Sequence, residues 1–201
     1  MINKIAIPLL FVSTLSILGC GSSAPVPEDK FFRLGAPSQG QAKPVFNGNV
    51  AVQRFQADGL HNGRAIIYSD SKQPLQLKQY HYHHWLDAPS QLVQNHLISY
   101  LRSVSAAPLV VSDQPGIQSD YIISGKIIEF EQFNDGNTTR SKVKLELQVR
   151  KPRARTPLLV KEYAETITAA DANIHNVAKS LSNGLTTIYE KFITDLSAKT
   201  S

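Results

Sequence analysis

The feature that most constrains the fold is a pair of long strand-like segments joined by a short turn. Residues 120–133 form the first segment, residues 142–150 form the second, and the turn-forming sequence NDGN at residues 134–137 lies between them. Because successive side chains of a strand point to opposite faces, this pattern predicts an antiparallel hairpin with one buried face. The second strand, KVKLELQVR, places these residues on the core face: Val143, Leu145, Leu147 and Val149.

Shorter strand-like segments and two amphipathic helices account for the rest of the folded part. The strands are predicted at residues 31–35, 50–57, 64–70, 75–85, 108–113 and 158–169. Apolar residues recurring every three or four positions predict one helix over residues 87–104, with Asp87 as N-cap and Pro89 in the first turn. The same period predicts a second helix over residues 171–198, with Asp171 as N-cap. Together they predict an α+β fold, a two-layer arrangement of a largely antiparallel sheet with two amphipathic helices packed on one face.

The N-terminus carries the pattern of a secretion signal. A short positive start containing Lys4 precedes an apolar run over residues 5–18, too short to span a bilayer comfortably but typical of a signal peptide. The run ends in SILGC, whose Cys20 is the only cysteine of the chain, and this ending resembles a bacterial lipobox. The resemblance implies cleavage before Cys20 and acylation of its sulfur. The alternative is an ordinary signal peptide with a stray cysteine, but a lone thiol is a liability in an oxidising compartment.

These patterns divide the chain into three parts. We predict residues 1–19 as a lipoprotein signal peptide, residues 20–30 as a lipidated flexible tether, and residues 31–201 as a single folded domain. Gly21 and Ser22 follow the lipobox cysteine, where enteric-type bacteria place an aspartate to retain a lipoprotein in the inner membrane. The expected location is therefore the outer membrane, lipid-anchored, with the domain facing the periplasm.

The sequence QYHYHHW at residues 79–85 is the best candidate for a metal site. Strand alternation places His81 and His83 on the face of Trp85, together with Leu75 and Leu77. Zinc generally needs three or four protein ligands, and the other histidines lie far away in the sequence. We therefore predict no built metal site and no cofactor, with the histidine pair as weak candidates only. An aromatic strand that packs beside the first helix is the favoured interpretation.

No pattern of catalytic residues stands out. The chain lacks a G-x-S-x-G nucleophile elbow and a glycine-rich phosphate loop, so we predict no enzymatic activity. The formal net charge is +5, and a basic turn gathers several cations between two predicted strands. This turn would contact anionic phospholipid or an acidic partner rather than nucleic acid, or it is a solvated turn that discourages edge pairing. Its residues are Arg150, Lys151, Arg153 and Arg155.

Several stretches together resemble a known family. The sequence FFRLG at residues 31–35, the region over residues 50–102 and the long closing helix are similar to the auxiliary lipoproteins of ABC-type transport systems, the group that includes paraquat-inducible protein C. In this family a strand ending in tyrosine and tryptophan leads through an acidic residue and proline into the first helix. The matching residues are Tyr82, Trp85, Asp87 and Pro89, with Arg64 and Tyr68 on the preceding turn and strand.

The resemblance implies a non-enzymatic component of an intermembrane lipid transport system that supports membrane integrity. Its expected partner is the mammalian-cell-entry-type periplasmic protein of an ABC transporter, which it would dock at the outer membrane. The matching residues Tyr82, Trp85, Asp87 and Pro89 would form a partner or packing surface, and a homo-oligomer would suit a ring-shaped partner. The alternative function is a periplasmic module that binds lipid or another small ligand between helices and sheet.

Overall fold

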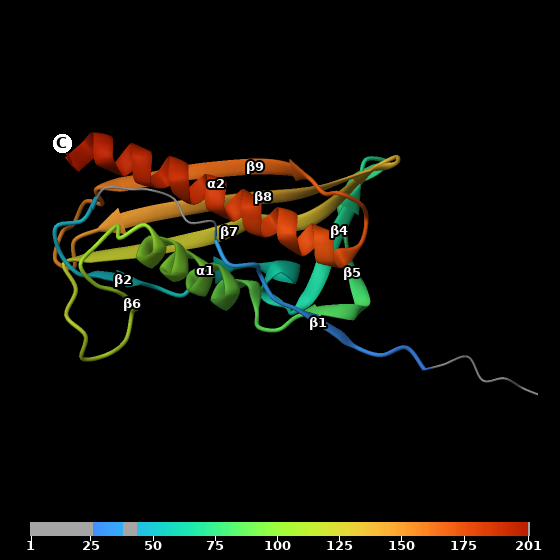
Figure 1. Ribbon diagram of the computed structural model, residues 1–201, viewed down its shortest axis with the longest axis horizontal. Coiled ribbons are helices and arrows are strands. Elements are labelled where there is room, and N and C mark those ends of the chain that lie inside the picture. The colour runs from blue at the N-terminus through green and yellow to red at the C-terminus, as the bar shows by residue number, and fades with distance from the viewer. Residues whose placement is uncertain (1–25, 38–43, 201) are drawn as a thin grey trace, which may run out of the picture.

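The computed structural model describes residues 26–37 and 44–200. The predicted signal peptide, Cys20 and most of the predicted tether lie outside these residues. The described part is an α+β fold in which helices α1 (Pro89–Ser103) and α2 (Ile174–Thr200) cover the same face of a curled, nine-stranded mixed sheet (Figure 1). The predicted fold class and the two helices on one face are therefore confirmed.

The predicted long hairpin forms the centre of the sheet. Strand β7 (Tyr121–Asp135) pairs antiparallel with β8 (Thr138–Arg150), which pairs antiparallel with β9 (Leu159–Thr168). Along β8 half-buried and buried residues alternate without interruption, as its sequence pattern predicts. Gly136 in the β7–β8 turn has φ +59°, a left-handed conformation that glycine adopts at little cost.

The other edge of β7 is covered by three short strands that run parallel to it. Strands β2 (Val50–Val52), β3 (Gln56–Ala57) and β4 (Ala65–Asp70) pair with β7 one after the other, and β6 (Val110–Ser112) pairs parallel with β2. A 3-10 helix, η1 (Gly59–Asn62), separates β3 from β4. The sheet is mixed because β2, β3 and β4 pair parallel with β7. The long strands β7, β8 and β9 pair antiparallel with one another.

A β-bulge changes which residues of β5 face the core. Strand β5 (Gln73–Trp85) pairs antiparallel with β4, but its partners jump from Gln79 to His84 while β4 advances only from Ile67 to Ala65. The extra residues shift the alternation of side chains between the two halves of β5.

Contacts and exposure confirm this shift. The rings of Tyr80 and His83 lie 5.3 Å apart, on the same side of the strand. In a regular strand these two side chains, three positions apart, would point to opposite sides. Leu75 is 99% exposed and Leu77 37%, whereas Trp85 is 1% exposed. The predicted common face of Leu75, Leu77 and Trp85 is therefore wrong, because the pattern carries no sign of a bulge.

Both predicted N-caps need correction. Helix α1 begins at Pro89, as the first-turn proline predicts, but the preceding residue is Ala88 and no side chain caps the helix, so Asp87 is not the cap. At the start of α2 the Asn173 side chain accepts a hydrogen bond from the backbone N–H of His175 at 2.9 Å. Asp171 instead accepts from the backbone N–H of Asn173, which stabilises the approach to the helix.

The helices and the sheet enclose one hydrophobic core. The apolar stripe of α2 is almost fully buried against β8 and β9, and Leu181, Leu185 and Phe192 are 0% exposed. A Cβ atom on Gly184 would lie 3.2 Å from a methyl carbon of Val143, so this glycine allows α2 to approach the sheet closely. Within the described residues, neither helix is long and apolar enough to cross a bilayer.

Candidate interaction surfaces

The residues that carry the family resemblance divide into buried and exposed ones. Trp85 packs on Phe130 in the core, with ring centroids 5.4 Å apart, and Pro89 is buried at the start of α1. Tyr82 is 45% exposed, and Asp87 is also exposed. Trp85 and Pro89 thus have packing roles, and only Tyr82 and Asp87 remain available to a partner.

The N-terminal strand extends the surface around Tyr82. Strand β1 (Lys30–Phe32) pairs parallel with the end of β5, with Phe31 opposite His84. Phe31 is 54% exposed, and its ring lies 5.8 Å from that of His84 and 5.3 Å below the guanidinium of Arg64. Tyr82 lies in the bulged part of β5, two residues before His84, and is 45% exposed. We call Phe31, Tyr82 and the neighbouring exposed Leu86 the β1–β5 surface.

The histidines of β5 have different surroundings. His81 is exposed, whereas the ring of His83 lies between Phe32, at 5.7 Å, and Tyr80, at 5.3 Å. Partial burial lowers the pKa of His83, and the nearby charges of Lys30 and His84 lower it further. The described part of the chain brings no group of three histidine, cysteine or carboxylate side chains together for a metal ion.

The predicted basic turn connects β8 to β9, and acidic side chains lie near its basic ones. Arg150 donates a hydrogen bond to the carbonyl of Pro152 at 3.2 Å, and Lys151 lies 5.9 Å from the ring centroid of Tyr121. Arg153 and Arg155 are exposed. A surface cavity of about 640 Å³ is lined by Lys151 and Arg153 but also by two carboxylates, Asp113 and Asp120. The mixed charge weakens the attraction of this end for an anionic surface.

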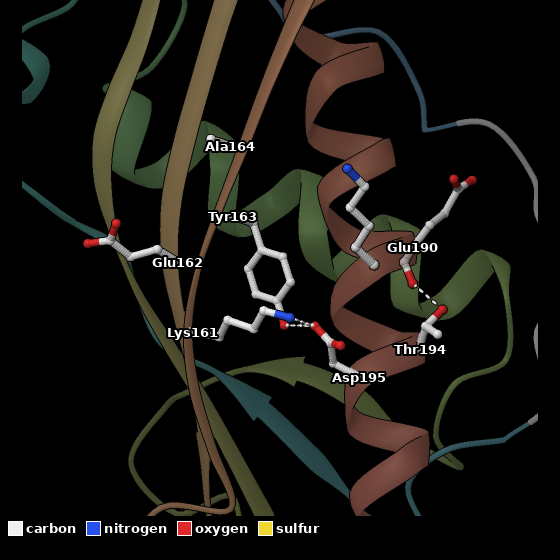
Figure 2. A pocket seen from close by; sticks show the side chains of 8 residues that line it. Lys161, Glu162, Tyr163, Ala164, Glu190, Thr194 and Asp195 are labelled. Carbon is white, nitrogen blue, oxygen red and sulfur yellow. Dashed lines mark hydrogen bonds and ion pairs between the residues drawn. The ribbon is translucent and has the colours of Figure 1, made fainter.

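A polar cluster between β9 and α2 was not predicted from the sequence. Tyr163 and Lys161 point from β9 towards Asp195 on α2 and donate hydrogen bonds to the same carboxylate oxygen, at 2.8 and 2.7 Å (Figure 2). The hydrogen bonds from Lys161 and Tyr163 lower the pKa of Asp195. Burial and the bond to Asp195 raise the pKa of Tyr163. The cluster therefore fastens the edge strand to the helix and holds no activated nucleophile.

A second cluster lies buried under η1. Ser69 donates a hydrogen bond to Glu131 at 2.6 Å, and Nε2 of His61 lies 4.0 Å from the other carboxylate oxygen. All three side chains are buried. Burial lowers the pKa of His61, while Glu131 and Glu129 act in the opposite direction. The hydrogen bond from Ser69 satisfies one oxygen of this buried carboxylate, whereas Nε2 of His61 has no hydrogen-bond partner among the described residues.

The segment after β1 forms a basic groove with the first half of α2. The backbone N–H of Gly35 donates to Ser182 at 2.9 Å, which holds the segment against the helix. The resulting cavity of about 760 Å³ is the N-terminal groove. Of the described residues that line it, Arg33, His175 and Lys179 are basic, and none is an aspartate or glutamate. Sequence reasoning missed the groove because its two walls are separated by about 140 positions.

Solved structures share this fold. A crystal structure of a Xanthomonas campestris protein of family DUF330 superimposes with a TM-score of 0.73 at 13% identity, covering 85% of this chain and 95% of that one. The crystal structure of an uncharacterized protein gives a TM-score of 0.63 at 13% identity, covering 84% and 98%. At these identities the likeness shows the fold alone. No curated protein matches the chain significantly.

The family itself is shown by a match along the sequence. The model of the family described as the ABC-type transport auxiliary lipoprotein component matches residues 32–191, from the end of β1 into α2. This description indicates an auxiliary role in an ABC-type transport system and confirms the family predicted from the sequence. The chain belongs to the family of ABC-type transport auxiliary lipoproteins.

Proposed function

We propose that the chain is an outer-membrane-anchored periplasmic lipoprotein that docks the mammalian-cell-entry-type protein of an ABC-type lipid transporter and so supports membrane integrity. The observation that carries this proposal is the family match over residues 32–191, which begins shortly after the lipobox-like Cys20. The family description supports a role in ABC-type transport, and the lipobox-like sequence ending in Cys20 supports a lipid anchor.

The arrangement of the N-terminus supports a tethered domain. Lys30, the first residue of β1, follows Cys20 by ten positions, and an extended chain of that length reaches about 35 Å. Two or more acyl chains are needed for stable membrane anchoring, and a bacterial lipobox cysteine would supply them after cleavage. The domain would then act close to the membrane that holds it.

The packing of the domain supports docking rather than ligand storage. The described side chains of α2 that face the sheet, such as Leu181 and Leu185, are fully buried against it. Exposed rings lie instead on the β1–β5 surface, where Phe31 is 54% and Tyr82 45% exposed. Aromatic residues are enriched in protein interfaces, so we propose this surface as the docking site. These observations favour the docking role over the alternative of a lipid- or small-ligand-binding module.

Anchoring is tested by replacing the predicted lipidated cysteine. Cys20→Ser should abolish incorporation of radiolabelled palmitate and release the protein from the outer-membrane fraction into the soluble periplasm. The wild-type chain, expressed from the same promoter, serves as the control. Equal labelling and equal membrane association of the two proteins would refute the anchor.

Docking is tested by photo-crosslinking in cells. A photoreactive phenylalanine at Tyr82 should capture a mammalian-cell-entry-type protein identified by mass spectrometry. The same probe at Val160, which is 49% exposed on β9, serves as the matched control. Capture from Val160 alone would move the docking site to β9, and capture of no such protein from either position would refute the docking role.

A further inference from the structure

The N-terminal groove has a charge that neither the family description nor the proposed docking role uses. Arg33 and Lys179 are exposed, and neither makes an ion pair among the described residues, whereas Asp29 nearby is engaged by His84 at 3.5 Å. His175 adds a third basic side chain from the first turn of α2. Among its described lining residues the groove therefore holds two cations, Arg33 and Lys179, and no carboxylate that would neutralise them.

The groove also begins where the tether ends. Its first lining residue, Phe31, directly follows Lys30, and the hydrogen bond from Gly35 to Ser182 holds the same segment on α2. The membrane that holds the acylated Cys20 lies within about 35 Å of Lys30. The basic turn between β8 and β9 has no such link to the anchor and carries Asp113 and Asp120 in its cavity.

We infer that the N-terminal groove binds anionic phospholipid headgroups of the membrane to which the chain is anchored, through Arg33 and Lys179, and so lays this side of the domain against the bilayer. The inference rests on the proposed anchoring at Cys20. A phosphodiester in the groove receives hydrogen bonds from Arg33, whose planar guanidinium suits phosphate, and charge from Lys179.

The anchored geometry makes a modest attraction effective. A basic residue near an anionic surface strengthens association by about fivefold, and the attraction falls off within a Debye length of about 8 Å. Alone, two or three such residues would bind a vesicle weakly. Behind a short tether the headgroups are already concentrated near the groove, so the same residues suffice to set the orientation of the domain.

The test uses the natively lipidated full-length protein carrying Asn183→Cys. Asn183 is exposed and lines the groove, and acylation of Cys20 leaves the new thiol as the single labelling site. A polarity-sensitive fluorophore on this thiol should emit at shorter wavelength in vesicles of phosphatidylcholine with phosphatidylglycerol than in vesicles of phosphatidylcholine alone. Added salt should remove the difference, because exposed charges are screened.

Matched charge reversals identify the face that carries the effect. Arg33→Glu with Lys179→Glu should abolish the difference in emission, whereas Arg153→Glu with Arg155→Glu on the β8–β9 connection should preserve it. Thermal unfolding of each variant shows whether the fold is intact, and all four positions are exposed.

The possible failures are distinguishable. If the labelled protein fails to float with either kind of vesicle, the anchor itself is absent and the inference falls with it. If the protein floats with both but its emission is the same, the anchor stands and the groove does not bind anionic headgroups. Loss of the difference in the Arg153 and Arg155 variant, with retention in the Arg33 and Lys179 variant, would place the membrane contact at the opposite turn and overturn the inference.

Discussion

Trp85 packs its indole ring on the ring of Phe130, with centroids 5.4 Å apart and both side chains at most 2% exposed. The contact joins the end of β5 to the middle of β7 across β4. The tryptophan of the family pattern therefore has a structural role, while Tyr82, three residues earlier, faces solvent.

Truncation of this tryptophan should destabilise the domain strongly. Trp85→Ala removes a large buried ring and leaves a cavity, so we expect the free energy of unfolding to fall by about 3–5 kcal/mol. Tyr82→Ala, its matched control on the same strand, should change it by less than about 0.5 kcal/mol. Urea denaturation followed by circular dichroism measures both, and similar losses in the two variants would contradict the assignment.

A methyl group at Gly125 should not fit. A Cβ atom there would lie 2.4 Å from the ring of Phe55 and 2.8 Å from the carbonyl oxygen of Glu146. Gly125→Ala should therefore lower the free energy of unfolding by about 1–3 kcal/mol. Phe55→Leu gives way to the methyl group, so a double-mutant cycle should show a favourable coupling of about 0.5 kcal/mol or more between the two positions. Strict additivity would show that the ring is not the obstacle.

Acid should destabilise the domain through His96. This residue of α1 is 5% exposed, and burial lowers its pKa to about 4 against a smaller opposing contribution from the backbone of Gly35. Above pH 6.5 the histidine is neutral in both the folded and the unfolded chain. As the pH falls from 6.5 towards 4, the unfolded chain takes up a proton that the folded chain refuses, so stability is lost.

The contribution of His96 is measured by difference. A shift from 6.5 to about 4 corresponds to a loss of up to about 3 kcal/mol when the pH falls through this window. His96→Leu removes the titrating group, so the free energy of unfolding of this variant should decline less steeply below pH 6.5 than that of the wild type. Parallel profiles for the two proteins would show that His96 protonates freely in the folded state.

Tyr163 should resist ionisation in alkaline solution. Burial and its hydrogen bond to Asp195 both disfavour the phenolate, so the pKa of Tyr163 lies well above the ordinary value of 10.0. Asp195→Asn removes the negative charge and should move this pKa part of the way back. Near-ultraviolet absorbance titrations, with Tyr163→Phe to identify the transition, measure it. An unchanged titration in Asp195→Asn would mean that burial alone sets the pKa.

The sequence predicted those parts of the fold that depend on local periodicity. The uninterrupted alternation of β8 and the apolar stripe of α2 are set by which side chains must be buried, and both are as expected. The bulge in β5 was not predictable, because extra residues in one strand are defined only by its pairing with β4. The parallel pairing of β2 and β4 with β7 was not predicted for the same reason. Strands pair through backbone hydrogen bonds, and the side chains do not indicate which strand is the partner or in which direction it runs.

The candidate surfaces were predicted less completely than the fold. The family pattern includes both Tyr82 and Trp85, but it does not show which of the two is buried. That depends on the bulge in β5 and on the contact of Trp85 with Phe130. The basic turn was visible as a run of cations, whereas Asp113 and Asp120 enter its cavity from other segments. The N-terminal groove joins Arg33 to Lys179 only through the tertiary fold, and no local pattern could have shown it.

The three short strands that follow one edge of β7 impose an order on how the chain acquires its structure. Strands β2, β3 and β4 pair with β7 through residues about 65–70 positions later, whereas β4 meets β5, and β7 meets β8, across a tight turn. Since local pairings close quickly and distant ones pay a larger loop entropy, these two hairpins should form first, and β7 should then serve as the template that joins β2, β3 and β4 to the sheet. A chain made from its N-terminus onwards must therefore wait, with β2, β3 and one edge of β4 unpaired, until β7 has emerged.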